Sequence, residues 1–211
     1  GVKRCLMYEA LILLWTYNGF YMTWCNNYYR SSIYQRTTTS PATFDEEAFL
    51  SLLKTYTSRI NAEWTRERAE TGARLEEEIK AYYNRVPASY GLAEARTWQH
   101  PKRTLFNPIY SAVGIQGFME PLLAESCINH DVQAFDYPFV YAHEYAHLLG
   151  ISSEAEANFW AFETCIRSKN PPIRYSAYNG LLAYVANNAR MALDKEAYEK
   201  WFATIRQEVI N

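Results

Sequence analysis

The chain has 211 residues and a formal net charge of −2, and hydrophobic residues make up 49% of it. This length suits one domain with a single substantial core, and the apolar content excludes a disordered chain. Because the charge is near zero and no basic block is present, a nucleic-acid-binding role is excluded as well. The four cysteines lie far apart without a CxxC pair, which excludes a zinc ribbon and a disulfide-dense fold.

An apolar segment, Cys5–Trp24, opens the chain after Lys3 and Arg4. At about twenty residues it is long enough to cross a bilayer as a helix. Its basic start and aromatic end are typical of a positive-inside flank and an interfacial belt. Glu9 and Asn18 inside the segment argue against insertion. From composition alone, a membrane helix and an apolar helix packed on a soluble core are equally open.

Residues 1–30 therefore form an N-terminal unit, and the polar residues 31–43 are expected to be a linker. Apolar residues at spacings of three and four predict helix over 45–86. Between 101 and 131, prolines and glycines divide the chain into pieces too short for helices, with short strands predicted at 117–119 and 125–129. Helix signals return from residue 136. We expect a mainly α domain over 44–211, with a small irregular antiparallel β element drawn from 104–130.

The chemistry-bearing residues concentrate in an HExxH motif formed by His143, Glu144 and His147. On a helix the two histidines, four residues apart, lie on one face and can reach a single metal ion. Pro138 fits the first turn of such a helix and Gly150 its end, which predicts a helix over 137–149. The alternative is a pair of histidines satisfied by carboxylates or backbone inside a helical core.

A catalytic zinc takes three protein ligands, so a third must follow the motif. Ser153 is a poor zinc ligand, which leaves Glu154, Glu156 and Glu163 on a second helix expected over 153–168. Glu163 lies about 10 Å along the helix from Glu156, so the two cannot share one metal. Glu156 also fits the third position of a capping box that begins at Ser153. The residues alone therefore leave the third ligand open.

HExxH followed by Glu-Ala-x-Asn resembles the gluzincin zinc metallopeptidases. More closely, and over nearly its whole length, the chain resembles an uncharacterised bacterial family of membrane-anchored proteins that carry a zinc metallopeptidase signature. The landmarks of this resemblance are residues 27–30, 101–102, 114–118, 125–129, 143–159 and 174–176. The resemblance implies a zincin-like α+β fold, one Zn²⁺ per chain, and a peptide or protein substrate.

Carried over by position, the resemblance makes His143, His147 and Glu156 the zinc ligands and Glu144 the general base. Asn158 stands where many gluzincins have an aspartate that orients a ligand histidine. Its neutral amide would raise the basicity of the imidazole less than a carboxylate does, which bears on metal affinity. Glu154 is expected beside the ligands, in contact with them rather than with the metal.

The remaining roles go to residues around the motif. Tyr175 is the candidate donor to the oxyanion of the reaction, with Tyr178 as a second choice. Gly117, Phe118 and Glu125 are expected to bind substrate, because an edge strand in this region can pair with an extended peptide.

The sequence thus predicts a zinc metalloendopeptidase in a bacterial cell membrane. Its N-terminal helix would be the anchor, and its catalytic domain would lie on the extracytoplasmic side. One alternative is a scaffold that keeps the fold without activity. Another is a peptide-binding or sensor module at the membrane that is stabilised by zinc. Such a structural site needs a fourth protein ligand, for example Glu154 or Cys127.

Overall fold

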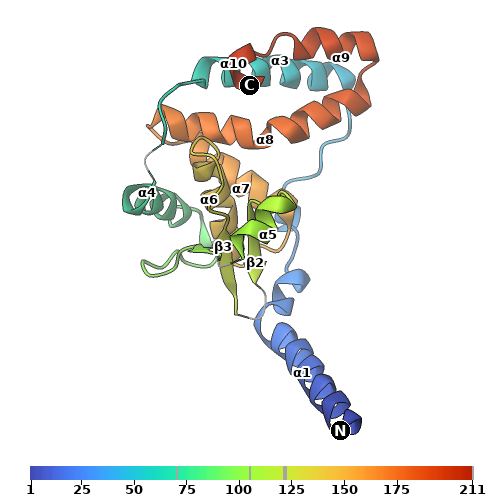
Figure 1. Ribbon diagram of the computed structural model, residues 1–211. Coiled ribbons are helices and arrows are strands. Elements are labelled where there is room, and N and C mark those ends of the chain that lie inside the picture. The colour runs from blue at the N-terminus through green and yellow to red at the C-terminus, as the bar shows by residue number, and fades with distance from the viewer. Residues whose placement is uncertain (70, 105, 121–122, 211) are drawn as a thin grey trace.

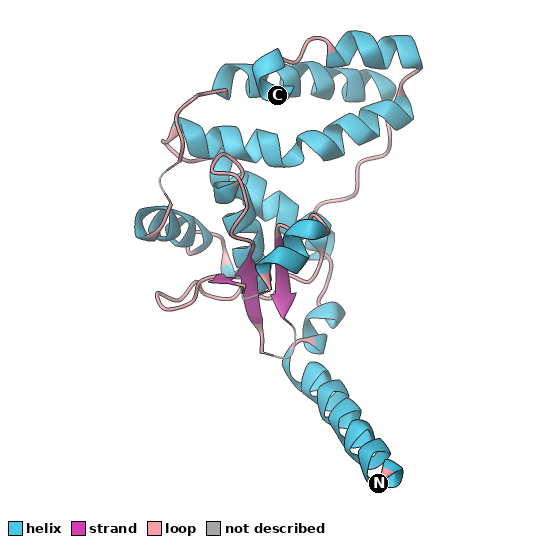
Figure 2. Cartoon of the chain, in the orientation of Figure 1, coloured by secondary structure: helices cyan, strands magenta, loops and turns pink. Residues whose placement is uncertain are grey.

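The computed structural model describes residues 1–69, 71–104, 106–120 and 123–210. The helices in chain order are α1 (Val2–Thr23), the 3-10 helix η1 (Cys25–Tyr29), α2 (Ile33–Thr37), α3 (Glu46–Glu63), α4 (Ala73–Tyr83), the 3-10 helix η2 (Ala88–Tyr90), α5 (Asn107–Ala112), α6 (Tyr137–Leu148), α7 (Glu154–Ile166), α8 (Pro171–Ala192), α9 (Lys195–Phe202) and α10 (Gln207–Ile210). The strands are β1 (Lys102–Arg103), β2 (Gly117–Glu120) and β3 (Glu125–Ile128). The fold is mainly α with a small sheet, as predicted (Figure 2).

Helix α1 projects away from the rest of the chain (Figure 1) and has no buried residue. The alternative of an apolar helix packed on the core is therefore wrong. Within the described residues, none of the helices has both the length and the apolar character that a membrane crossing requires. The role of α1 as a membrane anchor stays a prediction.

The region predicted as one helix over 45–86 is instead two helices, α3 and α4. Helix α3 begins at Glu46, after the N-cap Asp45, whose carboxylate accepts from the amide of Ala48, and it ends at Glu63. Trp64 leaves the helical conformation, and its indole N–H donates to the carbonyl of Glu208 at 3.1 Å. This contact with the far end of the chain is a tertiary one, so the helical periodicity of the sequence does not reveal the break.

The sheet has the order β1-β3-β2, with β3 in the centre. Strands β2 and β3 form the predicted antiparallel pair, in which Gly117 lies opposite Ile128 and Met119 opposite Ser126. Strand β1 adds a parallel pairing to β3 that was not predicted, so the sheet is mixed. The short helix α5 also lies in a region where no helix was expected.

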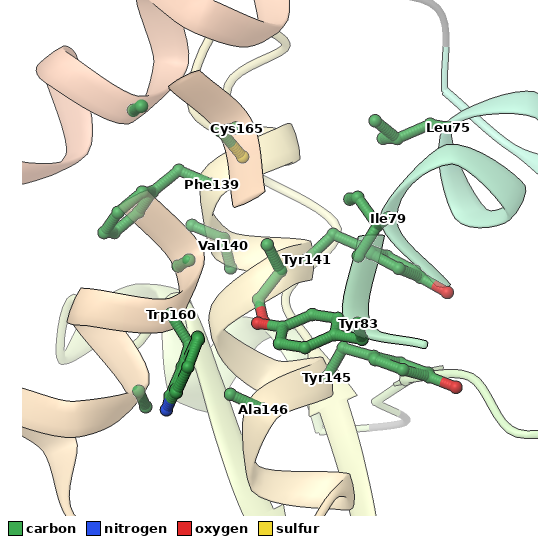
Figure 3. Close-up of a cluster of buried hydrophobic side chains, with 14 of the residues drawn as sticks. Leu75, Ile79, Tyr83, Phe139, Val140, Tyr141, Tyr145, Ala146, Trp160 and Cys165 are labelled. Atoms are coloured by element: carbon green, nitrogen blue, oxygen red, sulfur yellow. The ribbon is translucent and has the colours of Figure 1, made fainter. Parts of the chain in front are cut away.

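The two predicted helices of the metal motif are present as α6 and α7, within one or two residues of the expected bounds. Helix α6 is buried along most of its length and packs against α7, α8 and the sheet. Tyr141 and Tyr145 of α6 meet Tyr83 of α4 in the main core (Figure 3). The Tyr83 hydroxyl donates to the carbonyl of Ala142 at 2.8 Å. This packing makes α6 a rigid platform for the histidines.

A second core cluster lies at the end of the molecule opposite α1, where α8 packs against α3 (Figure 1). Its buried members are Tyr56, Ile60, Tyr175, Ile205 and Val209. The C-terminal helices thus close a layer over α8, on the side of α8 away from the sheet.

Candidate metal centre

The two histidines of the motif lie one turn apart on α6 and face the same side, as their spacing predicts. Their Nε2 atoms are 3.1 Å apart, and the two rings are nearly perpendicular. The His147 side chain is buried. Helix α6 ends directly after them, because Gly150 adopts a φ of +91° that favours glycine and turns the chain back toward α7.

The other nitrogen of each ring is held by an oxygen. Nδ1 of His143 lies 2.9 Å from Oδ1 of Asn158, and Nδ1 of His147 lies 2.6 Å from the carbonyl of Ile151. Both partners are acceptors, so both Nδ1 atoms carry the proton in the neutral rings. The Nε2 lone pairs therefore both point into the space between the rings.

The carboxylate of Glu154 completes this cluster. Its Oε2 lies 3.2 Å from Nε2 of His143, and its Oε1 lies 3.4 Å from Nε2 of His147. Three acceptors thus converge on one point, an arrangement that is satisfied by a cation. With one ligand atom from each residue, the three atoms lie within 4.8 Å of one another, wider than the roughly 3.3 Å between ligand atoms of a tetrahedral zinc with bonds of about 2.0–2.1 Å. In its chemistry, two imidazoles and one carboxylate, the donor set fits zinc.

Glu156, the predicted third ligand, does not join this cluster. Its carboxylate is buried and pairs instead with Arg36 of α2, and it accepts from the indole N–H of Trp160 at 3.0 Å. The reason lies in the helix period. Positions 154 and 158 share the face of α7 that looks at the histidines, whereas 156 and 160 share another face. The structure therefore brings Glu154, and not Glu156, to the histidine pair.

Glu144, the predicted general base, lies inside the protein next to the cluster and is 3% exposed. Its Oε2 accepts a hydrogen bond from the hydroxyl of Ser126 on β3. Its Oε1 lies so close to Gly117 on β2 that a Cβ there would be only 2.3 Å away. Burial raises the pKa of the Glu144 carboxyl above its ordinary value, although the Ser126 hydrogen bond and the histidines oppose the shift.

The electrostatics of the cluster reflect its three converging acceptors. In the protonated rings Nε2 donates to Glu154, and these hydrogen bonds hold the pKa of the Glu154 carboxyl well below its ordinary value. For His147, burial alone would lower the pKa, but hydrogen bonding to Glu154 and the charge of Glu144 outweigh it, so the pKa is raised. The second proton of the His147 ring is thus stabilised by the same carboxylate that completes the donor set.

The sequence matches, over residues 1–211, a protein family described as "Protein of unknown function (DUF3810)". The chain belongs to this family. No curated protein and no solved structure matches it. The DUF3810 family carries no assigned activity, so the residues themselves must support any function.

Tyr175, the predicted oxyanion donor of this DUF3810 chain, lies elsewhere. It is buried in the second core cluster, and its hydroxyl donates to Oδ1 of Asn179 at 3.2 Å. Tyr178 packs against Tyr56 and Phe162 beside that cluster. Burial raises the pKa of Tyr175 to about 12, as expected for a core tyrosine. The prediction relied only on the position of both tyrosines after α7 in the sequence. That position does not determine which face of α8 they occupy.

The three predicted substrate-binding residues divide between the two faces of the sheet. Gly117 lies on the face that meets α6, against Glu144. Phe118 is opposite Cys127 in the register and stacks on Tyr110 of α5, on the other face. Glu125 forms an ion pair with Lys102 of β1 at the surface. Of the three, only Gly117 contacts a residue of the motif.

The sequence analysis missed several groups that hold the site. They are the Ser126 hydroxyl on Glu144, the Ile151 carbonyl on His147, and the guanidinium groups of Arg30 and Arg36. Arg30, Ser126 and Ile151 fall within the landmarks that carried the resemblance, which is the one signal that pointed to them. Among the described residues, the cluster that could hold a metal ion consists of three residues, and Cys127 is not one of them.

Proposed function

We propose that this chain is a zinc-dependent hydrolase of peptide bonds, in which His143, His147 and Glu154 hold the metal and Glu144 is the general base. The observation that carries the proposal is the convergence of two imidazole nitrogens and one carboxylate within 3.1–3.4 Å of one another. Three protein ligands with a buried carboxylate beside them are typical of catalytic zinc sites. The resemblance to gluzincins supports the same chemistry.

Zinc bound there would supply a Lewis acid that acidifies water and polarises the carbonyl of the scissile bond. Glu144 would accept a proton from water and later deliver it to the leaving amine, work worth about 10²–10⁴-fold in rate. Two features of this chain suit Glu144 to that work. Burial raises its pKa, which makes it a stronger base, and the Ser126 hydroxyl holds one oxygen so that the other remains available.

The position of β2 at the edge of the sheet supports a peptide as the substrate. In the described sheet β2 pairs with β3 on one side, and an edge strand is a place where an extended chain can add by main-chain hydrogen bonds. Gly117 places the start of this strand directly against the base. An extended peptide along β2 would therefore pass close to Glu144.

The substitution that tests this function is Glu144→Gln. The amide is isosteric and can still accept from Ser126, but it cannot take a proton. We expect the variant to bind zinc as the wild type does, while hydrolysis falls by at least about 10²-fold. A peptide library incubated with the zinc-loaded wild-type chain identifies the substrate on which the two are compared.

The outcomes separate the proposed enzyme from the alternatives. If the wild type binds one zinc and cleaves nothing in the library, an inactive scaffold explains the site better. A zinc with four protein ligands would instead indicate a structural site in a binding or sensor module. If both proteins cleave equally well, Glu144 is not the base.

A further inference from the structure

We propose that the buried ion pair between Arg36 and Glu156 positions the metal ligand Glu154, an inference that rests on the proposed zinc site. Arg36 comes from the segment predicted to be a linker, and Glu156 from the first turn of α7. Their side chains are only 11% and 8% exposed. Arg36 and Glu156 would then be positioning residues that never touch the metal themselves.

Glu154 depends on such support because of its place in the helix. It is the first residue of α7, and its side chain is 73% exposed, so little packing surrounds it. The first turn of a helix has amide groups without intrahelical partners and must be held from outside. Ser153 contributes one contact, since its hydroxyl accepts from the amide of Glu156 at 3.4 Å. The orientation of Glu154 therefore follows from how firmly this turn is fixed.

The side chain of Glu156 fixes the turn from its other face. Both of its oxygens accept from Nη2 of Arg36, and Oε1 also accepts from Trp160. Arg36 is itself held, because Nε donates to the carbonyl of Ser31 at 2.9 Å and Nη1 donates to the carbonyl of Tyr90. The ion pair thus ties the start of α7 to two other segments of the chain.

The same N-terminal segment also holds the turn that joins the two ligand-bearing helices. Nη1 of Arg30 donates to the carbonyl of Gly150 at 2.7 Å, and the Ser152 hydroxyl donates to the carbonyl of Asn27 at 3.0 Å. A cation at the end of α6 also suits the negative end of the helix dipole. Residues 27–36 therefore brace the connection from His147 to Glu154 at both ends.

The chain offers a matched control in the ion pair of Arg174 with Glu63. It joins α8 to α3, its side chains are 26% and 20% exposed, and Arg174 also donates to the carbonyl of Ser168 at 3.1 Å. Breaking either pair leaves a carboxylate without its cation, which destabilises a protein whether or not a metal is involved. Only the Arg36 pair contacts the helix turn that carries Glu154.

The experiment measures zinc affinity by competition with a chelator, for the wild type, Arg36→Met and Arg174→Met. We expect Arg36→Met to bind zinc about 10- to 100-fold more weakly, as is typical when groups that hold a ligand are removed. Arg174→Met should keep its affinity within about twofold, because it is independent of the site. Equal affinities for wild type and Arg36→Met would overturn the inference, and so would equal losses in the two variants.

Two further variants keep the test decisive. If Arg36→Met does not fold, Arg36→Met/Glu156→Gln removes both charges, and the same loss of zinc affinity is expected. In a Glu154→Gln background, Arg36→Met should change the affinity by less than about twofold, since the ligand it positions is gone. A full additional loss there would contradict positioning through Glu154. If the wild type binds no zinc, the proposed function fails first, and this inference falls with it.

Discussion

Gly117 allows the backbone of β2 to approach the proposed general base, and Gly117→Ala tests that arrangement. The added Cβ would lie 2.3 Å from Oε1 of Glu144 and 2.6 Å from its Cδ. The first distance is about 1 Å short of an ordinary contact, so the carboxylate must retreat by about 1 Å. A displacement of that size in a catalytic group costs about 10²-fold in rate. Overpacking should also lower the free energy of unfolding by about 1–3 kcal/mol.

The assay compares kcat/KM for zinc-loaded wild type and Gly117→Ala on a peptide that the wild type cleaves, together with zinc affinity and Tm. We expect kcat/KM to fall by about 10²-fold while zinc affinity stays within about twofold, because Glu144 is not a ligand. Gly180→Ala is the control, since its Cβ would lie equally close, at 2.3 Å, to the ring of Phe139. It should lower Tm with far less loss of kcat/KM. Full activity in Gly117→Ala would refute the assignment of Glu144.

Three further predictions concern the metal itself. Glu154→Gln should lower zinc affinity by more than about 100-fold in chelator competition, because a neutral amide replaces a charged ligand. A loss of zinc affinity no larger than that of Glu144→Gln would contradict the role of Glu154 as a ligand. Asn158→Ala should weaken zinc binding by about tenfold, because the hydrogen bond that orients the His143 ring is lost. Unchanged zinc affinity would show that this hydrogen bond is dispensable. Zinc competes with protons for Nε2 of His147, so zinc affinity falls as the pH falls. Because the pKa of the His147 imidazole is raised above 6.5, this fall should begin above pH 6.5. Affinity that stays constant on acidification through that value would contradict this.

The local part of the site was predictable from the sequence, because it depends on short-range periodicity. The spacing of His143 and His147 places both on one face, and Gly150 ends α6 where its positive φ is needed. The resemblance to gluzincins implied that Asn158 lies beside a histidine, and its Oδ1 is hydrogen-bonded to His143. The helix period also indicates the third residue of the cluster, which the prediction of Glu156 overlooked. If Asn158 faces His143, then Glu154, four residues earlier, faces it too, and Glu156 is turned about 200° away from Glu154.

The parts that could not be predicted depend on contacts between distant segments. The face of α8 on which Tyr175 lies is set by its packing on α3 and on the C-terminal helices. At the break after α3, Trp64 contacts Glu208 near the far end of the chain. The pairing of Arg36 with Glu156 spans 120 positions, and no spacing rule relates two such residues. Single-sequence patterns describe helix faces but not what those faces meet.

The structure of the zinc-loaded protein, determined at a resolution that defines the metal ligands, tests the central claim most directly. We predict one zinc per chain, bound by Nε2 of His143, Nε2 of His147 and a carboxylate oxygen of Glu154 at about 2.0–2.1 Å, with the fourth position open to solvent. Glu156 should remain paired with Arg36. A zinc bound by Glu156 in place of Glu154, or closed by a fourth protein ligand, would contradict the account.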